Sequence, residues 1–220
     1  MVFIDGSNFY HALRIANLPI NADFGHLISE IVGKERELVR AYYYNASLPP
    51  DDDAEQYERQ RLFFEELKEI SYFELRLSRL ERRDYGLVEK GSDVMLAVDM
   101  VMYAAKDLYD VAILISGDGD FTPAIRYVKD MGKHVELAYP KEAKAYALKQ
   151  VCDKFIPLQR SHLIRQPQKL AQPPQAVKSQ RQSQKRPHRP SKKSQYNSPQ
   201  RPATAKPAGA TAQGKLSGDK

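Results

Sequence analysis

The sequence predicts an α/β fold in which a parallel sheet is flanked by helices. Three observations predict it. Short apolar runs alternate with helical patterns along the first 160 residues, which is the order expected for strands joined by helices. Residues 111–115 form a continuous apolar run, typical of a central parallel strand buried on both faces. Residues 111–138 then make a complete strand–helix–strand unit, the clearest one in the chain.

The first half of the chain supplies two strands and three helices. We predict strands at 2–4 and 38–44, and helices at 8–16, 24–32 and 51–70. The helix at 24–32 keeps its apolar side chains on one face. Pro49 and Pro50 break the chain, and the following run of three aspartates offers an N-cap and an acidic first turn for the third helix.

The second half begins with a half-exposed strand, because residues 72–80 alternate apolar and polar side chains. Residues 85–88 extend this strand or pair with it across a turn at Arg83 and Asp84. Ser92 is a suitable cap for a helix over 93–106, and Pro123 suits the first turn of another. We predict the remaining elements as helices at 122–131 and 141–151 and strands at 111–115, 135–138 and 155–156.

The last quarter of the chain differs sharply in composition from the rest. Residues 166–220 hold 12 of the 34 lysines and arginines, one of the 28 acids and 8 of the 14 prolines. They contain no Ile, Phe or Met, so they bury too little apolar surface to offset the entropy of ordering. We therefore predict one domain over residues 1–160 and a disordered, basic Pro/Gln/Ser-rich tail over residues 161–220.

The opposite net charges of the two parts of the chain indicate what kind of molecule the chain binds. Residues 1–165 carry 22 bases and 27 acids, a net charge of −5, whereas residues 166–220 carry +11. Flexible basic segments bind phosphate backbones with little sequence preference. We expect RNA, in single-stranded form, as the partner of the tail, and a solubilising role is the alternative.

Other classes of protein are excluded by simple counts. The single cysteine, Cys152, excludes an internal disulfide framework and a multi-cysteine zinc site, and the five histidines show no ligand spacing. No basic and apolar export signal precedes the first strand. The most apolar helix pattern, near residues 94–105, is shorter than the roughly 20 residues that span a bilayer. We expect a cytoplasmic protein without a membrane segment.

Acidic residues follow two of the predicted strands and begin one helix. Asp5 follows the first strand directly, and Asp118 and Asp120 follow the run at 111–115 within a glycine-rich turn. Asp93 lies at the start of a helix. Ligands of open parallel sheets bind at the carboxyl ends of the strands, so these acids can converge at one edge. Asp99 lies about 120° around the same helix from Asp93 and either flanks the site or points to solvent, so it is left out of the set.

Clustered carboxylates repel one another unless a cation neutralises them. A set of hard oxygen ligands without His or Cys suits Mg²⁺ or Mn²⁺, and such a site suits phosphoryl chemistry because the metal activates water and stabilises phosphate charge. Each acid also has a plainer explanation, since Asp5 and Asp93 are suitable helix caps and the glycines suit a tight turn. A turn alone, however, does not need acids at the ends of two different strands.

Four further residues are candidates for substrate binding: Asn8, Lys90, Ser116 and Thr122. Asn8 either orients a water or phosphate or caps a helix. Ser116 and Thr122 bracket the acidic turn and are able to hydrogen-bond its carboxylates or a phosphate. Lys90 either meets a phosphate or is simply solvated. The aromatic run at residues 42–44 either fills the core or offers stacking surfaces for single-stranded bases.

Three segments together resemble the signatures of the NYN domain, in its LabA-like branch. They are residues 2–8 (VFIDGSN), 90–93 (KGSD) and 116–123 (SGDGDFTP), and the resemblance spans residues 1–157 in the family's motif order. NYN domains belong to the PIN-like nuclease superfamily. The resemblance implies a PIN-like (Rossmann-like) parallel sheet and an acidic cluster that binds Mg²⁺ or Mn²⁺ to cleave RNA. Its ligand candidates are Asp5, Asp93, Asp118 and Asp120, with Asn8 in support.

Two hypotheses follow. The first is a metal-dependent endoribonuclease in which these four aspartates hold one or two cations and the basic tail captures RNA. The second is a non-catalytic regulator that uses the same fold to bind RNA, a nucleotide or a protein partner. The four acids favour the enzyme, because a pure binder does not need clustered carboxylates.

Overall fold

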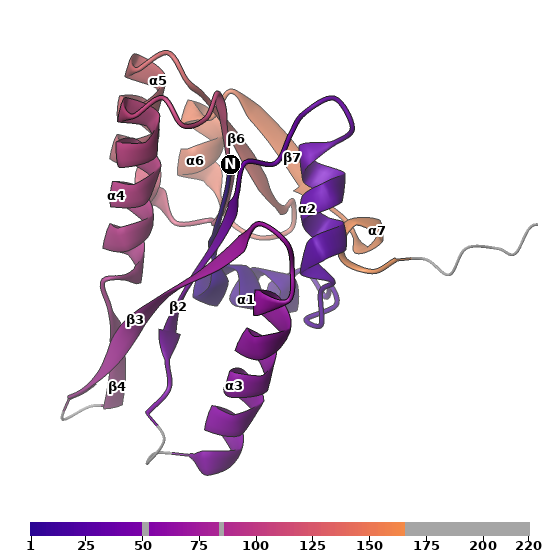
Figure 1. Ribbon diagram of the computed structural model, residues 1–220, viewed down its shortest axis with the longest axis vertical. Coiled ribbons are helices and arrows are strands. Elements are labelled where there is room, and N and C mark those ends of the chain that lie inside the picture. The colour runs from indigo at the N-terminus through magenta and orange to yellow at the C-terminus, as the bar shows by residue number, and fades with distance from the viewer. Residues whose placement is uncertain (50–52, 84–85, 166–220) are drawn as a thin grey trace, which may run out of the picture. The chain divides into compact units, whose positions relative to one another are not determined.

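A computed structural model describes residues 1–49, 53–83 and 86–165, and in this part of the chain seven strands form one sheet (Figure 1). The order across the sheet is β4-β3-β2-β1-β5-β6-β7. The strands are β1 (Val2–Asp5), β2 (Ala41–Ser47), β3 (Phe73–Arg83), β4 (Gly86–Lys90), β5 (Val111–Ile115), β6 (His134–Pro140) and β7 (Lys154–Leu158). The helices are α1 (Gly6–Ile15), α2 (Phe24–Val32), α3 (Ala54–Lys68), α4 (Ser92–Ala105), the short 3-10 helix η1 (Gly119–Phe121), α5 (Thr122–Asp130), α6 (Tyr146–Val151) and α7 (Arg160–Leu163).

Neighbouring strands of this sheet are parallel except at one edge, where β3 and β4 form an antiparallel hairpin. The predicted α/β fold with a parallel sheet between helices is therefore confirmed. From β1 the chain builds outward through β2 and β3, then returns to the other side of β1 and builds outward through β5, β6 and β7. The direction of winding thus reverses between β1 and β5, and such a reversal leaves a crevice at the carboxyl ends of the two strands.

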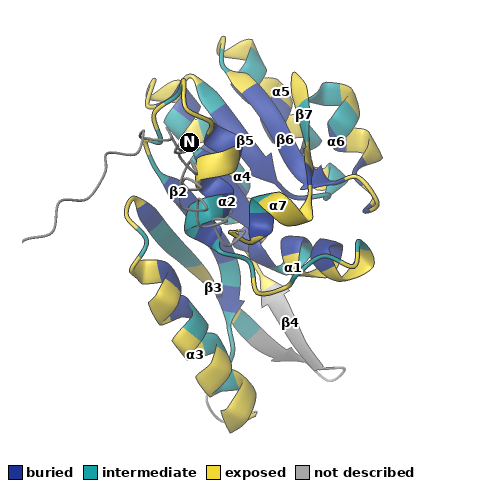
Figure 2. Ribbon diagram, turned by 90° about the vertical axis from the view of Figure 1, so that its right-hand side faces the viewer, coloured by how far each residue is buried: buried dark blue, intermediate teal, exposed yellow. Residues whose placement is uncertain are grey.

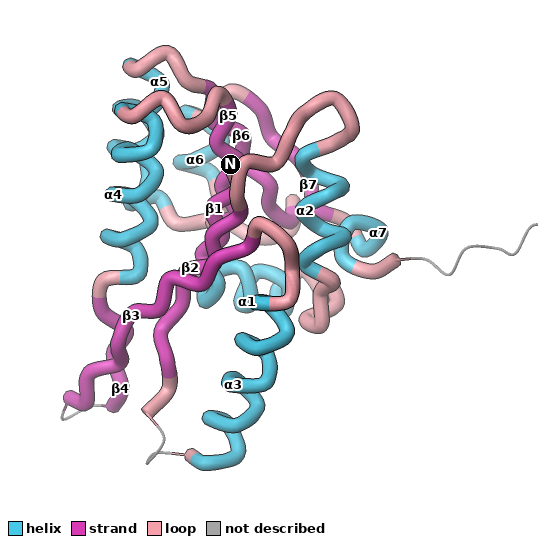
Figure 3. The backbone as a smooth tube through the Cα atoms, viewed as in Figure 1, coloured by secondary structure: helices cyan, strands magenta, loops and turns pink. Residues whose placement is uncertain are grey.

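Alternating side chains of the buried strands divide the core into two layers. Phe3 packs with the face covered by α4, α5 and α6, whereas Val2 and Ile4 pack with the face covered by α1, α2, α3 and α7. Figure 2 shows the central strands as buried, while α3 turns a largely exposed outer face to solvent. The tube in Figure 3 shows the same arrangement, with helices on both sides of the strands. Both faces of the central strands are therefore covered.

Most predicted elements lie within a few residues of their expected positions, and two differ for clear reasons. α6 begins at Tyr146 rather than at residue 141, because β6 continues to Pro140 and a turn follows in which the Ala143 amide donates to the Pro140 carbonyl. α4 begins at Ser92 itself, with Gly91 in the left-handed conformation before it. Ser92 is thus the first helical residue and not the cap.

α7 crosses the expected domain boundary at residue 160. Its Leu163 is buried, the Leu163 carbonyl accepts a hydrogen bond from the Asp23 amide, and the helix packs against α2. The basic segment 166–220, part of the three-aspartate run before α3, and Asp84 of the expected turn lie outside the described residues, so the predicted disorder stays a prediction. No helix in the described ranges combines the length and apolar character that crossing a membrane requires.

Candidate functional site

Asp5 lies at the reversal point of the sheet and makes contacts in two directions. It is the last residue of β1 and the N-cap of α1, where its Oδ1 accepts a hydrogen bond from the Asn8 amide over 3.1 Å. Its Oδ2 accepts a hydrogen bond from the Ser116 hydroxyl over 2.9 Å, and only 6% of the residue is exposed. The cap and the site are therefore compatible, because each carboxylate oxygen has a separate partner.

Ser116 connects Asp5 with the acidic turn. It follows β5 directly and is fully buried. In addition to donating to Asp5, its hydroxyl oxygen accepts a hydrogen bond from the Asp118 amide over 3.1 Å. Asp118 in turn caps η1, where its Oδ1 accepts from the Asp120 amide over 2.9 Å. One hydroxyl thus holds the ends of β1 and β5 and the start of the turn together.

Asn8 fixes the same turn from the side of α1. Its side-chain oxygen accepts hydrogen bonds from the Gly117 amide over 2.8 Å and from the Tyr139 hydroxyl over 2.6 Å. Gly117 is required here, since a Cβ atom would lie 2.6 Å from both the Tyr139 hydroxyl and the Lys144 carbonyl. Asn8 is therefore a positioning residue of the turn as well as part of the first turn of α1.

Tyr139 is a site residue that sequence reasoning missed, because an apolar strand with a tyrosine near its end carries no functional signal. Burial, followed by the negative charges of Asp5 and Asp118, raises the pKa of Tyr139 to about 12. The tyrosine is hence a neutral hydrogen-bond donor at physiological pH.

The remaining predicted residues lie on β4, α4, η1 and α5. Lys90 ends β4 and Asp93 is in the first turn of α4, both with exposed side chains. Asp120 is exposed in η1, and Thr122 begins α5 partly buried. Within the described ranges, no three carboxylate, imidazole or thiol groups come together as a metal-binding cluster. The Ser116 hydroxyl thus links the Asp5 carboxylate to the Asp118 amide, and the roles predicted for Asp93 and Asp120 stay predictions.

Asp99 has a different role. It accepts a hydrogen bond from the Tyr44 hydroxyl over 2.9 Å and lies 3.5 Å from Arg76 Nε. Burial, followed by the charge of Asp99, raises the pKa of Tyr44, so this hydroxyl stays protonated. Tyr44 is the register partner of Asp5 on β2, so Asp99 is tied by this bond to the strand next to the site. Tyr42 and Tyr44 are core residues on this face, as the core interpretation of the aromatic run predicts.

The donor atoms at the reversal point fit a hard divalent cation. Asp5 and Asp118 supply carboxylate oxygens, and Ser116 and Asn8 supply neutral oxygens. The hydrogen bonds that join these residues involve no sulfur atom and no imidazole. Such all-oxygen sets suit Mg²⁺ or Mn²⁺ rather than zinc or copper. In this set, Asp5 and Asp118 are the carboxylates that would hold such a cation.

A doubly wound sheet with acidic residues at its reversal point belongs to the class of open α/β folds that bind ligands at the carboxyl ends of their strands. Residues 1–159 match the NYN domain family, and the chain belongs to it. NYN domains form part of the PIN-like nuclease superfamily. The chain is also similar to the low amplitude and bright protein LabA of Synechococcus elongatus, with 26% identity over 163 residues that cover 71% of this chain and 82% of LabA. The predicted LabA-like NYN domain is confirmed.

A solved structure supports the fold. The chain resembles the crystal structure of a protein of unknown function from Vibrio parahaemolyticus, with a TM-score of 0.59 and 26% sequence identity. The match covers 74% of this chain and 94% of the Vibrio protein. The α/β body described above is therefore shared by a protein that has been seen by crystallography.

Proposed function

We propose that the protein is a metal-dependent endoribonuclease. The observation that supports this proposal is the Ser116 hydroxyl at the reversal point of the sheet, which links the Asp5 carboxylate to the backbone amide of Asp118. A buried aspartate at a ligand-binding edge is costly unless its charge is used or neutralised. Membership of the NYN domain family supports RNA as the substrate.

The residues of the site divide into three roles. Asp5 and Asp118 hold the divalent cation, with Asp93 and Asp120 as the further carboxylates that the family motifs supply. When bound, the cation offers Lewis-acid stabilisation to the charge that develops on the phosphate. Ser116, Asn8 and Tyr139 orient the two carboxylates and the turn between them. Lys90 and Thr122 are the proposed phosphate contacts at the rim.

A cleavage assay on single-stranded RNA with Mg²⁺ or Mn²⁺ tests the proposal. We expect the wild type to cleave, EDTA to abolish cleavage, and Asp118→Asn to reduce the rate by about a hundredfold or more, as for loss of a charge-stabilising group. Asp130→Asn is the matched control, because Asp130 is an exposed residue at the end of α5. Equal rates for Asp118→Asn and Asp130→Asn would overturn the proposal.

The same assay with and without residues 166–220 examines the tail. The tail carries a net charge of +11 and residues 1–165 carry −5, so a tethered basic arm raises the local concentration of RNA near an acidic body. We expect truncation at residue 165 to raise KM and leave kcat unchanged. Binding that persists in EDTA, with no cleavage under either metal, would instead identify the chain as a non-catalytic RNA-binding regulator.

A further inference from the structure

A groove of about 810 Å³ opens next to the candidate site, between α1 and α3 on the floor of β2. We call it the α1–α3 groove. It starts at Gly6 and Ser7, which follow Asp5 directly, and at Asn45, which follows the register partner of Asp5 on β2. The three elements that form it can be followed in Figure 1. The groove is within the range of known small-ligand sites and continues away from the paired acids.

Aromatic side chains from α1, α2, β2 and α3 contribute to the lining of the groove. Tyr43 and Phe63 pack against each other with ring centroids 5.8 Å apart, and Phe24 lies 5.9 Å from Phe63. At the α1 wall, Tyr10 is 44% exposed and Arg14 lies over its ring. Phe24 and Tyr43 are buried and form the base of the groove, whereas the exposed ring of Tyr10 offers a flat surface on which an unpaired base stacks.

The groove has few charged residues. Of the described residues that line it, none is an aspartate or glutamate, and the lining basic side chains are those of Arg59 and His11. Arg59 also forms an exposed ion pair with Glu55 on the same helix, over 3.6 Å. A pocket that combines aromatic rings with a guanidinium and lacks acids fits a ligand that has a flat ring and a negative charge.

The walls of the groove are held in place by hydrogen bonds and close packing. The Gln60 amide donates to the Ala46 carbonyl and its oxygen accepts from the Leu48 amide, which ties α3 to the end of β2. Asn45 donates to the Tyr43 hydroxyl over 3.3 Å. A Cβ atom at Gly6 would lie 2.4 Å from the Tyr43 ring, so this glycine lets the ring pack on the start of α1. The groove is therefore preformed.

We propose that the α1–α3 groove binds one unpaired nucleotide of the RNA strand, next to the phosphate that a cation at Asp5 and Asp118 would hold. The proposal rests on the proposed function, since it extends the path of the same substrate. The base stacks on the exposed ring of Tyr10, and Arg59 contacts a phosphate at the rim. The groove thereby selects single-stranded RNA, because a base within a duplex is already stacked and paired.

Binding to abasic RNA tests this inference without any cleavage. The full chain is titrated in EDTA with a fluorescently labelled RNA hexamer and with hexamers that lack one base at each position in turn. Every hexamer has the same phosphates, so the charge contribution of the basic tail cancels in the ratio of affinities. We expect removal of one particular base to weaken binding to the wild type about tenfold, as for loss of a stacked base.

Two pairs of variants assign that effect to the groove. In Tyr10→Ala the tenfold ratio falls to about twofold, whereas in the control Tyr127→Ala, an exposed tyrosine of α5, it stays at tenfold. Arg59→Ala weakens binding to all hexamers about threefold relative to Arg61→Ala, which alters another exposed arginine of α3. The inference is overturned if no base position matters or if each variant behaves like its control.

The outcome is separate from that of the cleavage assay. A chain that never cleaves RNA but shows the Tyr10-dependent loss retains the groove as a binding site, and only the enzymatic proposal fails. A chain that cleaves RNA but shows no such loss keeps its proposed function and loses this inference.

Discussion

The Ser116 hydroxyl donates to Asp5 Oδ2 over 2.9 Å, although 111 positions separate the two residues in the chain. Both are buried, and each directly follows or ends a central strand. Strands β1 and β5 are parallel neighbours with Ile4 opposite Ile115, so their register places the two side chains beside each other. The link between the two acidic motifs is thus built into the sheet.

Replacing Ser116 tests this link. Ser116→Ala removes the donor to Asp5 and the acceptor of the Asp118 amide, which leaves two buried polar groups without this partner. We expect the free energy of unfolding to fall by about 1–3 kcal/mol and RNA cleavage to fall with it. Urea unfolding measures the first effect. Ser29→Ala, an exposed serine of α2, is the control, and equal stability of the two variants would contradict the prediction.

The two glycines of the acidic turn make different predictions. In Gly117→Ala the new Cβ atom meets the Lys144 carbonyl at 2.6 Å, and a backbone atom cannot rotate away. We expect a loss of about 1–3 kcal/mol from overpacking and reduced cleavage. In Gly119→Ala the nearest atom is Ala147 Cβ at 3.4 Å, so this neighbouring variant is the control and stays close to wild type. Thermal unfolding measures the stability of both variants. Equal melting temperatures for Gly117→Ala and Gly119→Ala would refute the prediction.

Tyr139 gives the site a dependence on alkaline pH. Its pKa is raised to about 12, first by burial and then by Asp5 and Asp118, whereas a tyrosine in the unfolded chain has a pKa of about 10. Above pH 10 the unfolded chain therefore releases a proton that the folded chain still holds, so the stability from this group is full below pH 10 and is lost as pH rises through 12.

We accordingly expect the free energy of unfolding of Tyr139→Phe to fall less than that of the wild type as pH rises from 10 to 12. At neutral pH the variant lacks the hydrogen bond to Asn8 and is less stable by about 1 kcal/mol. Between pH 10 and 12 the wild type loses stability that the variant does not have, so the gap between them narrows. Urea unfolding at several pH values measures the gap. Parallel curves for the two proteins would show that Tyr139 does not titrate as described, and Tyr127→Phe serves as the exposed control.

The elements that sequence predicted best depend on local periodicity. The helix expected at residues 24–32 and the strand expected at 111–115 agree with α2 and β5 at both ends. In α2 the apolar side chains share one face, and in β5 an unbroken apolar run indicates burial on both faces. Each pattern can therefore be recognised from a few consecutive residues. The position of Asp5 at a strand end was equally readable, because it follows the apolar run of β1 directly.

Contacts that depend on which strands become neighbours could not be predicted from the sequence. Tyr139 joins the site because β6 lies beside β5, and Asp99 pairs with Arg76 because α4 packs over β3. Neither residue has a local pattern that distinguishes it from an ordinary core tyrosine or a surface aspartate. The same limit holds for Tyr43, which faces the opposite side of β2 from its neighbours and lines the α1–α3 groove.

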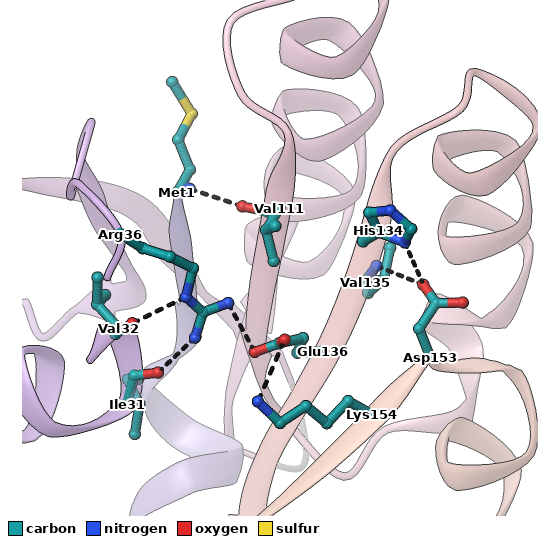
Figure 4. A network of polar contacts seen from close by, with 10 residues as sticks. All are labelled: Met1, Ile31, Val32, Arg36, Val111, His134, Val135, Glu136, Asp153 and Lys154. Atoms are coloured by element: carbon teal, nitrogen blue, oxygen red, sulfur yellow. Dashed lines mark hydrogen bonds and ion pairs between the residues drawn. The ribbon is translucent and has the colours of Figure 1, made fainter. Parts of the chain in front are cut away.

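A separate polar network stabilises the other end of the strands (Figure 4). Arg36 Nε and Nη2 donate to the carbonyls of Val32 and Ile31, which closes the last turn of α2. Its Nη1 lies 3.0 Å from Glu136 Oε2 in an ion pair without hydrogen-bond alignment, and Lys154 lies 3.5 Å from the other carboxylate oxygen. Glu136 is buried, so its charge depends on these two cations.

Removing Arg36 should therefore destabilise the fold without altering the chemistry of the site. Arg36→Ala leaves a buried carboxylate with Lys154 alone and exposes two carbonyls, so we expect the free energy of unfolding to fall by about 2–4 kcal/mol. Arg36→Lys keeps the positive charge but loses the paired hydrogen bonds to the carbonyls of Val32 and Ile31. We expect its free energy of unfolding to lie between those of the wild type and Arg36→Ala. Arg126→Ala, an exposed arginine of α5, is the control.

The Arg36 network also lies away from the candidate site. Glu136 lies near the start of β6 and Tyr139 near its end, so the cleavage rate of folded Arg36→Ala should equal that of the wild type. A variant as stable as Arg126→Ala, or one that is stable but inactive, would show that the network does not act as a purely structural support.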